Sequence, residues 1–201
     1  MNRLDRIRAL RVLLSSLGLT GVGRPYNSLL SSNIFELYCY MKKLNEFQAS
    51  GKSPIMVSIS GNPHVFRPHL SPGTPRNADY FQLIGNRASE NRDLILNGQF
   101  EGISGIYHSP DIVLTEQNDN QVITFYECKH YSGRLTPNVY REFIGYCKEM
   151  GITISKSGSR YSAFANTFSV MTPCLFTSAC ARSDHKDSLR EAYNLEIRDR
   201  Y

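Results

Sequence analysis

Two acidic residues and a lysine in the middle of the chain have a spacing that fits metal-assisted chemistry. Asp111 follows Pro110, fifteen residues separate it from Glu127, and Lys129 comes two positions later. Side chains alternate between the faces of a strand, so Glu127 and Lys129 would project from one face of a strand over residues 122–129. Burying a carboxylate and an ammonium at the end of an apolar strand is costly without partners. The partners that this pattern predicts are each other, a divalent cation, or both.

The surrounding residues predict a β-hairpin that brings the two carboxylates together. Residues 112–114 and 122–129 have strand-forming sequences, and the Asn-Asp-Asn triplet at 118–120 is typical of the turn between them. Antiparallel pairing through this turn would place the carboxylate of Asp111 close to that of Glu127.

A carboxylate pair of this kind suits an oxygen-liganded cation such as Mg²⁺. Such an ion can activate water for attack on a phosphodiester, and Lys129 can orient that water or neutralise developing charge. Ile123 and Phe125 are expected to share the face of Glu127, which favours a buried site over a solvated cross-strand pair. For Asp111 the structural alternative is a turn residue that caps the backbone after a proline.

The pattern Pro110-Asp111 … Glu127-Cys128-Lys129 resembles the PD-(D/E)xK, or restriction-endonuclease-like, nuclease superfamily. The resemblance implies that Asp111, Glu127 and the main-chain carbonyl of Cys128 bind catalytic Mg²⁺, with Mn²⁺ as a substitute. It implies that Lys129 assists the nucleophile. It also implies a core of helix, three strands, helix and strand, and it extends over residues 30 to 199.

An earlier helix adds a third acid within Ile34-Phe35-Glu36-Leu37. Many members of the superfamily, especially the Mrr-like restriction nucleases, carry a glutamate there that reaches the metal site. The resemblance therefore makes Glu36 a candidate catalytic residue, while a solvent-facing position remains the alternative. Mrr-like proteins often place a glutamine after the motif lysine, whereas His130 follows here, which leaves membership of that subgroup open.

Three side chains are candidates for contact with nucleic acid. His130 would lie on the strand face opposite to Lys129, and Arg141 begins the polar face of the next helix. Arg67 lies in the proline-rich segment 61–79, which also holds His69 and Arg76, and a solvated loop is the alternative there. The net charge of +5 is compatible with a phosphate-backbone partner but does not by itself indicate one.

The other patterns predict one α/β fold with a mixed central sheet flanked by helices. Residues 1–25 are interpreted as an N-terminal amphipathic helix with a linker, and residues 26–201 as the nuclease-like domain. Ser31-Ser32-Asn33 would cap the second helix, and Pro173 would place its strand at an edge or a bulge. The predicted helices cover residues 3–17, 34–48, 136–150 and 183–193, and the predicted strands cover 54–60, 93–100, 112–114, 122–129, 170–177 and 195–198.

Composition narrows the class of protein. The chain is 41% hydrophobic and 20% charged, and no apolar run approaches the ~18 to 20 residues that span a bilayer. Five widely spaced cysteines without zinc-ligand spacing predict buried free thiols in a reducing compartment. Arginines and an aspartate interrupt the amino-terminal apolar stretch, which favours an amphipathic helix over a signal peptide, so we expect a cytoplasmic protein with no membrane partner. The leucine stripe of residues 3–17 would pack on its own domain or form the contact of a homodimer.

Together these patterns predict a Mg²⁺-dependent endonuclease that hydrolyses phosphodiester bonds, with DNA as the preferred partner. A catalytically inactive nucleic-acid-binding or scaffold module on the same fold is the first alternative. An interaction domain without a nucleic-acid role is the second. DNA versus RNA, the target sequence, strandedness, oligomeric state and biological role stay open at this stage.

Overall fold

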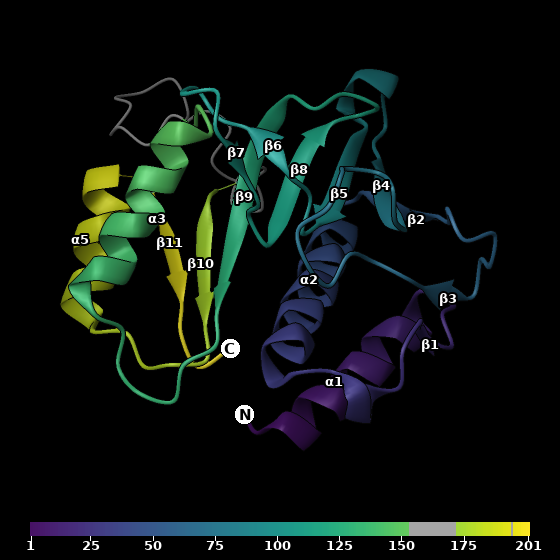
Figure 1. Cartoon of the computed structure of the whole chain (residues 1–201), viewed down its shortest axis with the longest axis horizontal. Helices are drawn as coiled ribbons and strands as arrows, with labels where there is room; N and C mark the ends of the chain where they lie inside the picture. Colours follow the sequence, from purple (N-terminus) through teal and green to yellow (C-terminus); the bar gives the residue numbers. More distant parts are fainter. Residues whose placement is uncertain (153–171, 194) are drawn as a thin grey trace.

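The computed structural model describes residues 1–152, 172–193 and 195–201, and it shows a mixed β-sheet with helices on both faces (Figure 1). The described sheet has seven strands in the order β11-β10-β9-β8-β5-β4-β2. The helices are α1 (Arg3–Ser16), α2 (Ser31–Ala49), α3 (Pro137–Glu149) and α5 (Ser183–Tyr193). The strands of this sheet are β2 (Ser53–Val57), β4 (Tyr80–Ile84), β5 (Arg92–Leu96), β8 (Ile112–Glu116), β9 (Val122–Lys129), β10 (Cys174–Thr177) and β11 (Glu196–Arg198).

Smaller elements lie outside the sheet. Two-residue strands form a parallel ribbon, β1 (Gly21–Val22) with β3 (Val65–Phe66), and an antiparallel ribbon, β6 (Phe100–Glu101) with β7 (Tyr107–His108). Two 3₁₀ turns are η1 (Tyr26–Ser28) and η2 (Ala88–Glu90).

The sheet combines both kinds of strand pairing. β2, β4, β5, β8 and β9 pair antiparallel in that order, whereas β9, β10 and β11 run parallel. Parallel neighbours need a crossover connection, and α3 lies in the connection between β9 and β10. The α/β class and the mixed sheet are as predicted.

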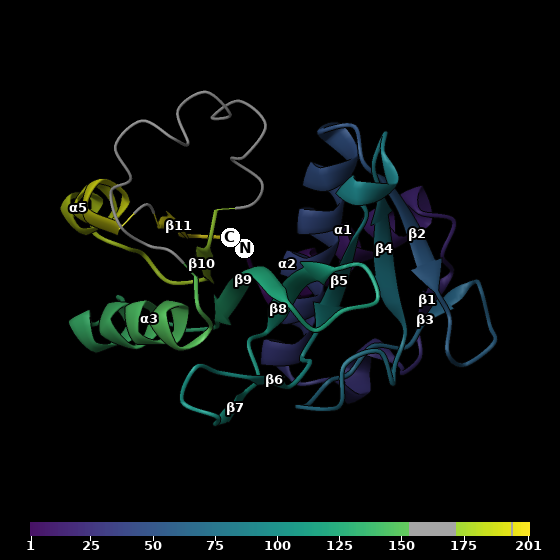
Figure 2. The ribbon, with the colours of Figure 1, turned by 90° about the horizontal axis from the view of Figure 1, so that it is seen from above.

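Helices cover the sheet in two layers, which are separated in the view of Figure 2. α1 and α2 pack on the face that carries Tyr126 and Cys128 of β9. α3 packs on the opposite face with Phe125, and Leu189 of α5 contacts the same cluster. Successive residues of β9 therefore point into different cores, as strand geometry requires.

The leucine stripe of α1 is covered within the chain. Ile7, Leu10 and Leu14 are buried in the core that α1 shares with α2. The two ends of the chain lie side by side (Figures 1 and 2), and the guanidinium of Arg6 donates a hydrogen bond to the carbonyl oxygen of Tyr201 at 3.3 Å. The stripe therefore packs on its own domain, which was one of the two outcomes expected for it. None of the helices in the described residues combines the length and apolarity needed to traverse a bilayer.

Three predicted boundaries were wrong at their ends. The strand predicted over residues 54–60 is β2, which ends at Val57. α2 begins at Ser31, and its N-cap position is Leu30 without a side-chain hydrogen bond, so Ser31-Ser32-Asn33 form the first helical turn instead of a cap. The strand predicted over residues 93–100 ends at Leu96, because Asn97 adopts a left-handed backbone with φ +52°. Phe100 then pairs in the separate β6–β7 ribbon.

Pro173 does not mark a sheet edge. It lies just before β10, which pairs with both β9 and β11, so the lost backbone donor falls outside the ladder. Val170 and Met171, the first residues of that predicted strand, lie outside the described residues. All five cysteines are free thiols, and four of them are buried, as expected.

The alternation of β9 is interrupted by a β-bulge. β8 and β9 pair in one register from Ile112↔Tyr126 to Leu114↔Thr124, and then shift to Thr115↔Val122. The prediction that Ile123 shares the face of Phe125 was wrong: Ile123 packs against the core beneath α2. One extra residue in a strand breaks the two-residue alternation at that point.

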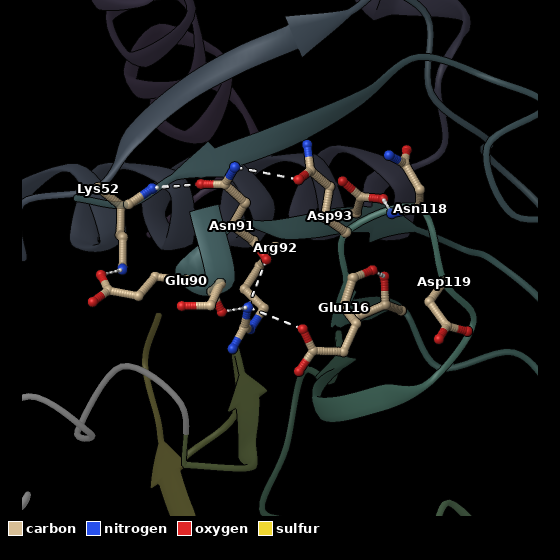
Figure 3. Close-up of polar contacts among 12 residues, drawn as sticks. Lys52, Glu90, Asn91, Arg92, Asp93, Glu116, Asn118 and Asp119 are labelled. Atoms are coloured by element: carbon tan, nitrogen blue, oxygen red, sulfur yellow. Dashed lines mark hydrogen bonds and ion pairs between the residues drawn. The ribbon is translucent and has the colours of Figure 1, made fainter. Parts of the chain in front are cut away.

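A polar network surrounds the hairpin turn at 118–120 (Figure 3). The buried carboxylate of Asp93 accepts hydrogen bonds from the Arg76 guanidinium at 2.8 Å and from the Asn118 backbone N–H at 2.9 Å. Arg92 pairs with Glu116 at 3.0 Å nearby. We call Arg76, Asp93 and Asn118 the turn-end cluster. Arg76 was considered above as part of a basic loop for nucleic acid, and it instead compensates a buried acid.

Candidate active site

The open end of the β8–β9 hairpin brings the two predicted carboxylates together. Because Ile112 pairs with Tyr126, the next residues outward, Asp111 and Glu127, are opposite each other. A carboxylate oxygen of Asp111 accepts a hydrogen bond from the backbone N–H of Cys128 at 2.6 Å. The predicted proximity of Asp111 and Glu127 is therefore present in the structure.

Lys129 extends from the same face of β9 as Glu127. Its ammonium lies 2.6 Å from one carboxylate oxygen of Glu127, whose side chain is only 12% exposed. Burial lowers the pKa of Lys129, but the neighbouring Glu127 carboxylate outweighs it and the pKa is raised overall. Lys129 is therefore held in its charged form beside the acids.

Positive charge at this end of the hairpin is too small to balance the acids. Burial raises the pKa of Asp111 well above its ordinary value, and the charges of Glu127 and Glu36 raise it further. Burial also raises the pKa of Glu127 in spite of Lys129. The second carboxylate oxygen of Glu127 is buried and has no hydrogen-bond partner among the described residues. Buried carboxylates in such a position normally bind a cation or take up a proton.

Glu36 reaches toward the same acids from α2. It is half-buried, and burial raises its pKa, with a further contribution from the charge of Glu127. The side-chain amide of Asn97 donates a hydrogen bond to Glu36 at 3.4 Å. The fully solvated position that was the alternative for Glu36 is therefore not observed.

Asn97 is a residue that sequence reasoning missed. It is buried just after β5, where its backbone N–H donates to the carbonyl oxygen of Asp111 at 2.8 Å. Its side chain bonds both Glu36 and the carbonyl oxygen of His69. Asn97 thus connects α2, the segment around His69 and the start of β8. The available signal was the Asn-Gly pair at 97–98, which marks a turn inside an otherwise apolar strand pattern.

A cavity of about 370 Å³ opens next to Glu127 and Lys129. Its other wall is α3, which contributes Val139, Glu142, Phe143 and Tyr146. The Tyr146 hydroxyl accepts a hydrogen bond from the backbone N–H of Ser109 at 3.0 Å, two residues before Asp111. Tyr146 was also missed, because it belongs to an ordinary apolar stripe of a helix and only the fold brings it to the loop before Asp111.

The three candidates for nucleic-acid contact lie outside this cavity. Arg141 is exposed on α3, where it bonds Asn138 at 3.3 Å. His130 is exposed on the α2 side, with its ring 5.7 Å from that of Phe35, so it lies on the face opposite to Lys129 as expected. Arg67 is exposed and lines a separate cavity. A role for any of the three in binding nucleic acid remains a prediction.

The residues present fit a magnesium ion better than a zinc ion. Within residues 1–152, 172–193 and 195–201, no group of three or more His, Cys, Asp or Glu side chains is arranged to hold a metal. Asp111 and Glu127 supply the carboxylate oxygens, and one buried oxygen of Glu127 has no hydrogen-bond partner among the described residues. Structural zinc sites are closed by four protein ligands, whereas Mg²⁺ usually has one or two carboxylates and keeps several waters.

Comparison with protein families, with curated proteins and with solved structures found no match to this chain in any of the three. Its function must therefore be inferred from its own residues.

Proposed function

We propose that this protein is a Mg²⁺-dependent nuclease with a site of the PD-(D/E)xK type. The observation that supports the proposal most directly is the half-buried pair Asp111 and Glu127, which lies with Lys129 beside a cavity. If β2 and β4, which precede β5 in the same sheet, are left out, the order α2, β5, β8, β9, α3, β10 agrees with the helix, three strands, helix and strand that the resemblance implies. DNA is the proposed substrate, and hydrolysis of a phosphodiester the proposed reaction.

The chain's own residues have distinct roles in this proposal. Asp111 and Glu127 would hold the ion, and the main-chain carbonyl of Cys128 would contribute a third oxygen. When bound, Mg²⁺ supplies an activated water and neutralises charge on the phosphodiester. Lys129, fixed in its charged form, would orient the attacking water or donate to a phosphate oxygen. Hydrolysis would form a bond from a water oxygen to phosphorus and break one P–O ester bond, and a proton of the water would end on the leaving alkoxide oxygen.

Glu36 and Tyr146 would complete the site from opposite sides. Glu36, bonded to Asn97, adds a third acid from α2. Tyr146 would act as a positioning residue, because its hydroxyl binds the backbone of the loop that leads into Asp111. Neither residue needs to contact the ion for these roles.

The proposal is tested by incubating the purified protein with plasmid DNA, single-stranded DNA and RNA, each with Mg²⁺, with Mn²⁺ and with chelator. We expect cleavage only with metal, and a fall in rate on the order of 10³-fold for Asp111→Ala, since several kcal/mol of charge stabilisation would be lost. Lys129→Ala should reduce the rate by about 10²-fold or more.

Asp119→Ala is the matched control, because this exposed acid lies at the opposite end of the same hairpin. It should cut as fast as the wild type. The nuclease proposal fails if no substrate is cut with either metal, or if Asp111→Ala cuts at the wild-type rate. Binding of nucleic acid without cleavage would instead favour the inactive module.

A further inference from the structure

A second cavity, of about 200 Å³, lies between α2 and the β1–β3 ribbon. Its walls are apolar and include Val22, Leu37 and Leu70, while two arginines, Arg24 and Arg67, also line it. Both arginines are exposed. The cavity thus combines an apolar lining with two guanidinium groups that solvent can reach.

The parallel ribbon explains why two arginines distant in sequence meet here. Gly21 pairs with Val65 and Val22 with Phe66, so both chains leave the ribbon at the same end. Arg67 follows its strand directly, and Arg24 comes two residues after the other strand. Their convergence is a product of strand pairing and is not evident from the sequence.

Gly23 makes room for one of these side chains. A Cβ atom at position 23 would lie 2.4 Å from Cγ of Arg67, well inside any tolerated contact. The conformation of Gly23 is not left-handed, so the requirement for glycine comes from the Arg67 side chain and not from the backbone. The Arg67 stem is therefore packed directly over the backbone of the ribbon.

Neither guanidinium is compensated by an acid. Across residues 1–152, 172–193 and 195–201, the side chains of Arg24 and Arg67 have no ion pair or hydrogen bond. Residues 1–30 hold five arginines and one aspartate, whereas the rest of the chain holds 18 basic residues (23 less 5) and 17 acidic ones (18 less 1). Most of the net charge of +5 is therefore in the segment that contains α1 and Arg24.

This cavity is linked to the candidate active site through two short connections. Leu37 in its wall follows Glu36 directly in α2. Along the other wall, the carbonyl oxygen of His69, two residues after Arg67, accepts the hydrogen bond of Asn97, which also bonds Glu36. Two residues of chain span at most about 7 Å, so the arginine cavity lies close to the Glu36 side of the site.

We propose that the cavity lined by Arg24 and Arg67 binds a phosphate of the same nucleic-acid strand on which the candidate active site acts. The forked donors of arginine match the oxygens of a phosphate, and two of them at one cavity favour a phosphodiester over a neutral ligand. The inference rests on the proposed function for the identity of the strand. It adds a separate anchoring position, which would set how the strand runs past Glu36.

The test measures binding in the presence of chelator, where no cleavage occurs, so that it does not depend on catalysis. Fluorescence anisotropy with a short labelled DNA duplex and with the matching single strand would compare the wild type with Arg24→Ala/Arg67→Ala. The control is Arg87→Ala/Arg190→Ala, which removes the same charge from two other exposed arginines. Thermal unfolding checks that all variants fold.

We expect the affinity of Arg24→Ala/Arg67→Ala to fall on the order of tenfold or more. The slope of log affinity against log salt should become less steep by ~0.7 for the single strand and ~0.9 for the duplex, since the contact with one phosphate is lost. The control variant should bind as the wild type does. Gly23→Ala keeps every charge, and it should still weaken binding because it displaces the Arg67 side chain.

Three results would overturn the inference. If the two double variants lose the same amount of DNA affinity, binding depends only on the overall charge of the protein and not on this cavity. Unchanged DNA binding by Arg24→Ala/Arg67→Ala would also overturn the inference. Calorimetry with inorganic phosphate would then show whether the cavity binds free phosphate instead. Failure of the wild type to bind any strand would also overturn it. Loss of cleavage in Asp111→Ala with unchanged binding by Arg24→Ala/Arg67→Ala would leave the nuclease proposal intact while rejecting the cavity.

Discussion

Carboxylates lie at both ends of the β8–β9 hairpin, fully buried at the turn and half-buried at the open end, and their charges are compensated to different degrees. At the turn, Asp93 is fully buried and is bonded to the Arg76 guanidinium and to the Asn118 backbone (Figure 3 shows Asp93 and Asn118). At the open end, Asp111 and Glu127 are close together, Glu36 adds a further acid, and Lys129 is the cation within hydrogen-bonding distance.

The difference separates a structural cluster from a candidate functional one. The charge of Asp93 is compensated within the fold by its own arginine and a backbone donor, both on one carboxylate oxygen, although the other oxygen has no hydrogen-bond partner among the described residues. At the open end, burial raises the pKa of all three half-buried acids, and the charge of Glu127 raises the pKa of Asp111 and of Glu36 further, so a further cation or protonation would stabilise them. The turn-end cluster should therefore matter for stability, and the open end for binding a metal. Three predictions test this contrast.

The largest effect is expected at the turn-end cluster. Arg76→Ala leaves Asp93 buried without its cation, and it should lower the free energy of unfolding by about 3–5 kcal/mol. Urea denaturation measures the change. The double variant Arg76→Ala/Asp93→Asn should recover part of the loss, because an amide at position 93 carries no charge. If Arg76→Ala lowers the free energy of unfolding by less than about 1 kcal/mol, the turn-end cluster does not stabilise the fold as proposed.

A smaller effect of the opposite sign is expected at the open end when metal is added. A ligand at 100 times its dissociation constant stabilises the folded state by about 2.7 kcal/mol. Saturating Mg²⁺ should therefore raise the melting temperature of the wild type by roughly 5 to 10 °C for a chain of this size. Differential scanning fluorimetry with Asp111→Asn as the control should show little shift for that variant. Equal shifts for both proteins would locate the ion elsewhere.

The smallest effect concerns the open end without metal. Asp111→Asn keeps an oxygen that can accept the Cys128 N–H, and it removes the repulsion of Asp111 by Glu127 and Glu36. In chelator the variant should be more stable than the wild type by about 1 kcal/mol, as expected when one uncompensated buried charge is removed. Equilibrium unfolding in urea measures the sign of the change in the free energy of unfolding. Destabilisation of Asp111→Asn by about 1 kcal/mol would contradict the proposal that these acids are uncompensated without a bound cation.

Local signals made most of the elements predictable. Helical periodicity located α1 and α5 almost to the residue, and the Asn-rich triplet located the turn that pairs β8 with β9. That one hairpin was enough to predict that Asp111 and Glu127 meet. Both signals depend on neighbours within a few positions, which is why they can be read from the chain.

Contacts between distant segments were not predictable in this way. Tyr146 reaches the loop before Asp111 across 37 positions of sequence, and Asn97 reaches Glu36 across 61. Arg76 resembled other basic residues of its loop until the fold placed it on Asp93. In each case a common residue type acquires its role from tertiary packing, and no pattern of spacing in the sequence predicts that role.

The irregularity at Leu114 and Thr115 has a consequence for evolution and engineering of the hairpin. If the pairing of Thr115 with Val122 had continued without interruption, Asp111 would be opposite Tyr126 and Glu127 would point toward α2. The single unmatched residue therefore decides whether the two acids face each other. Deleting Ile123 would remove the unmatched residue and keep Thr124 opposite Leu114 and Glu127 opposite Asp111, so metal binding should survive that deletion. Metal binding should be lost if β9 keeps its full length but pairs with β8 without the bulge, even though every acidic side chain is retained.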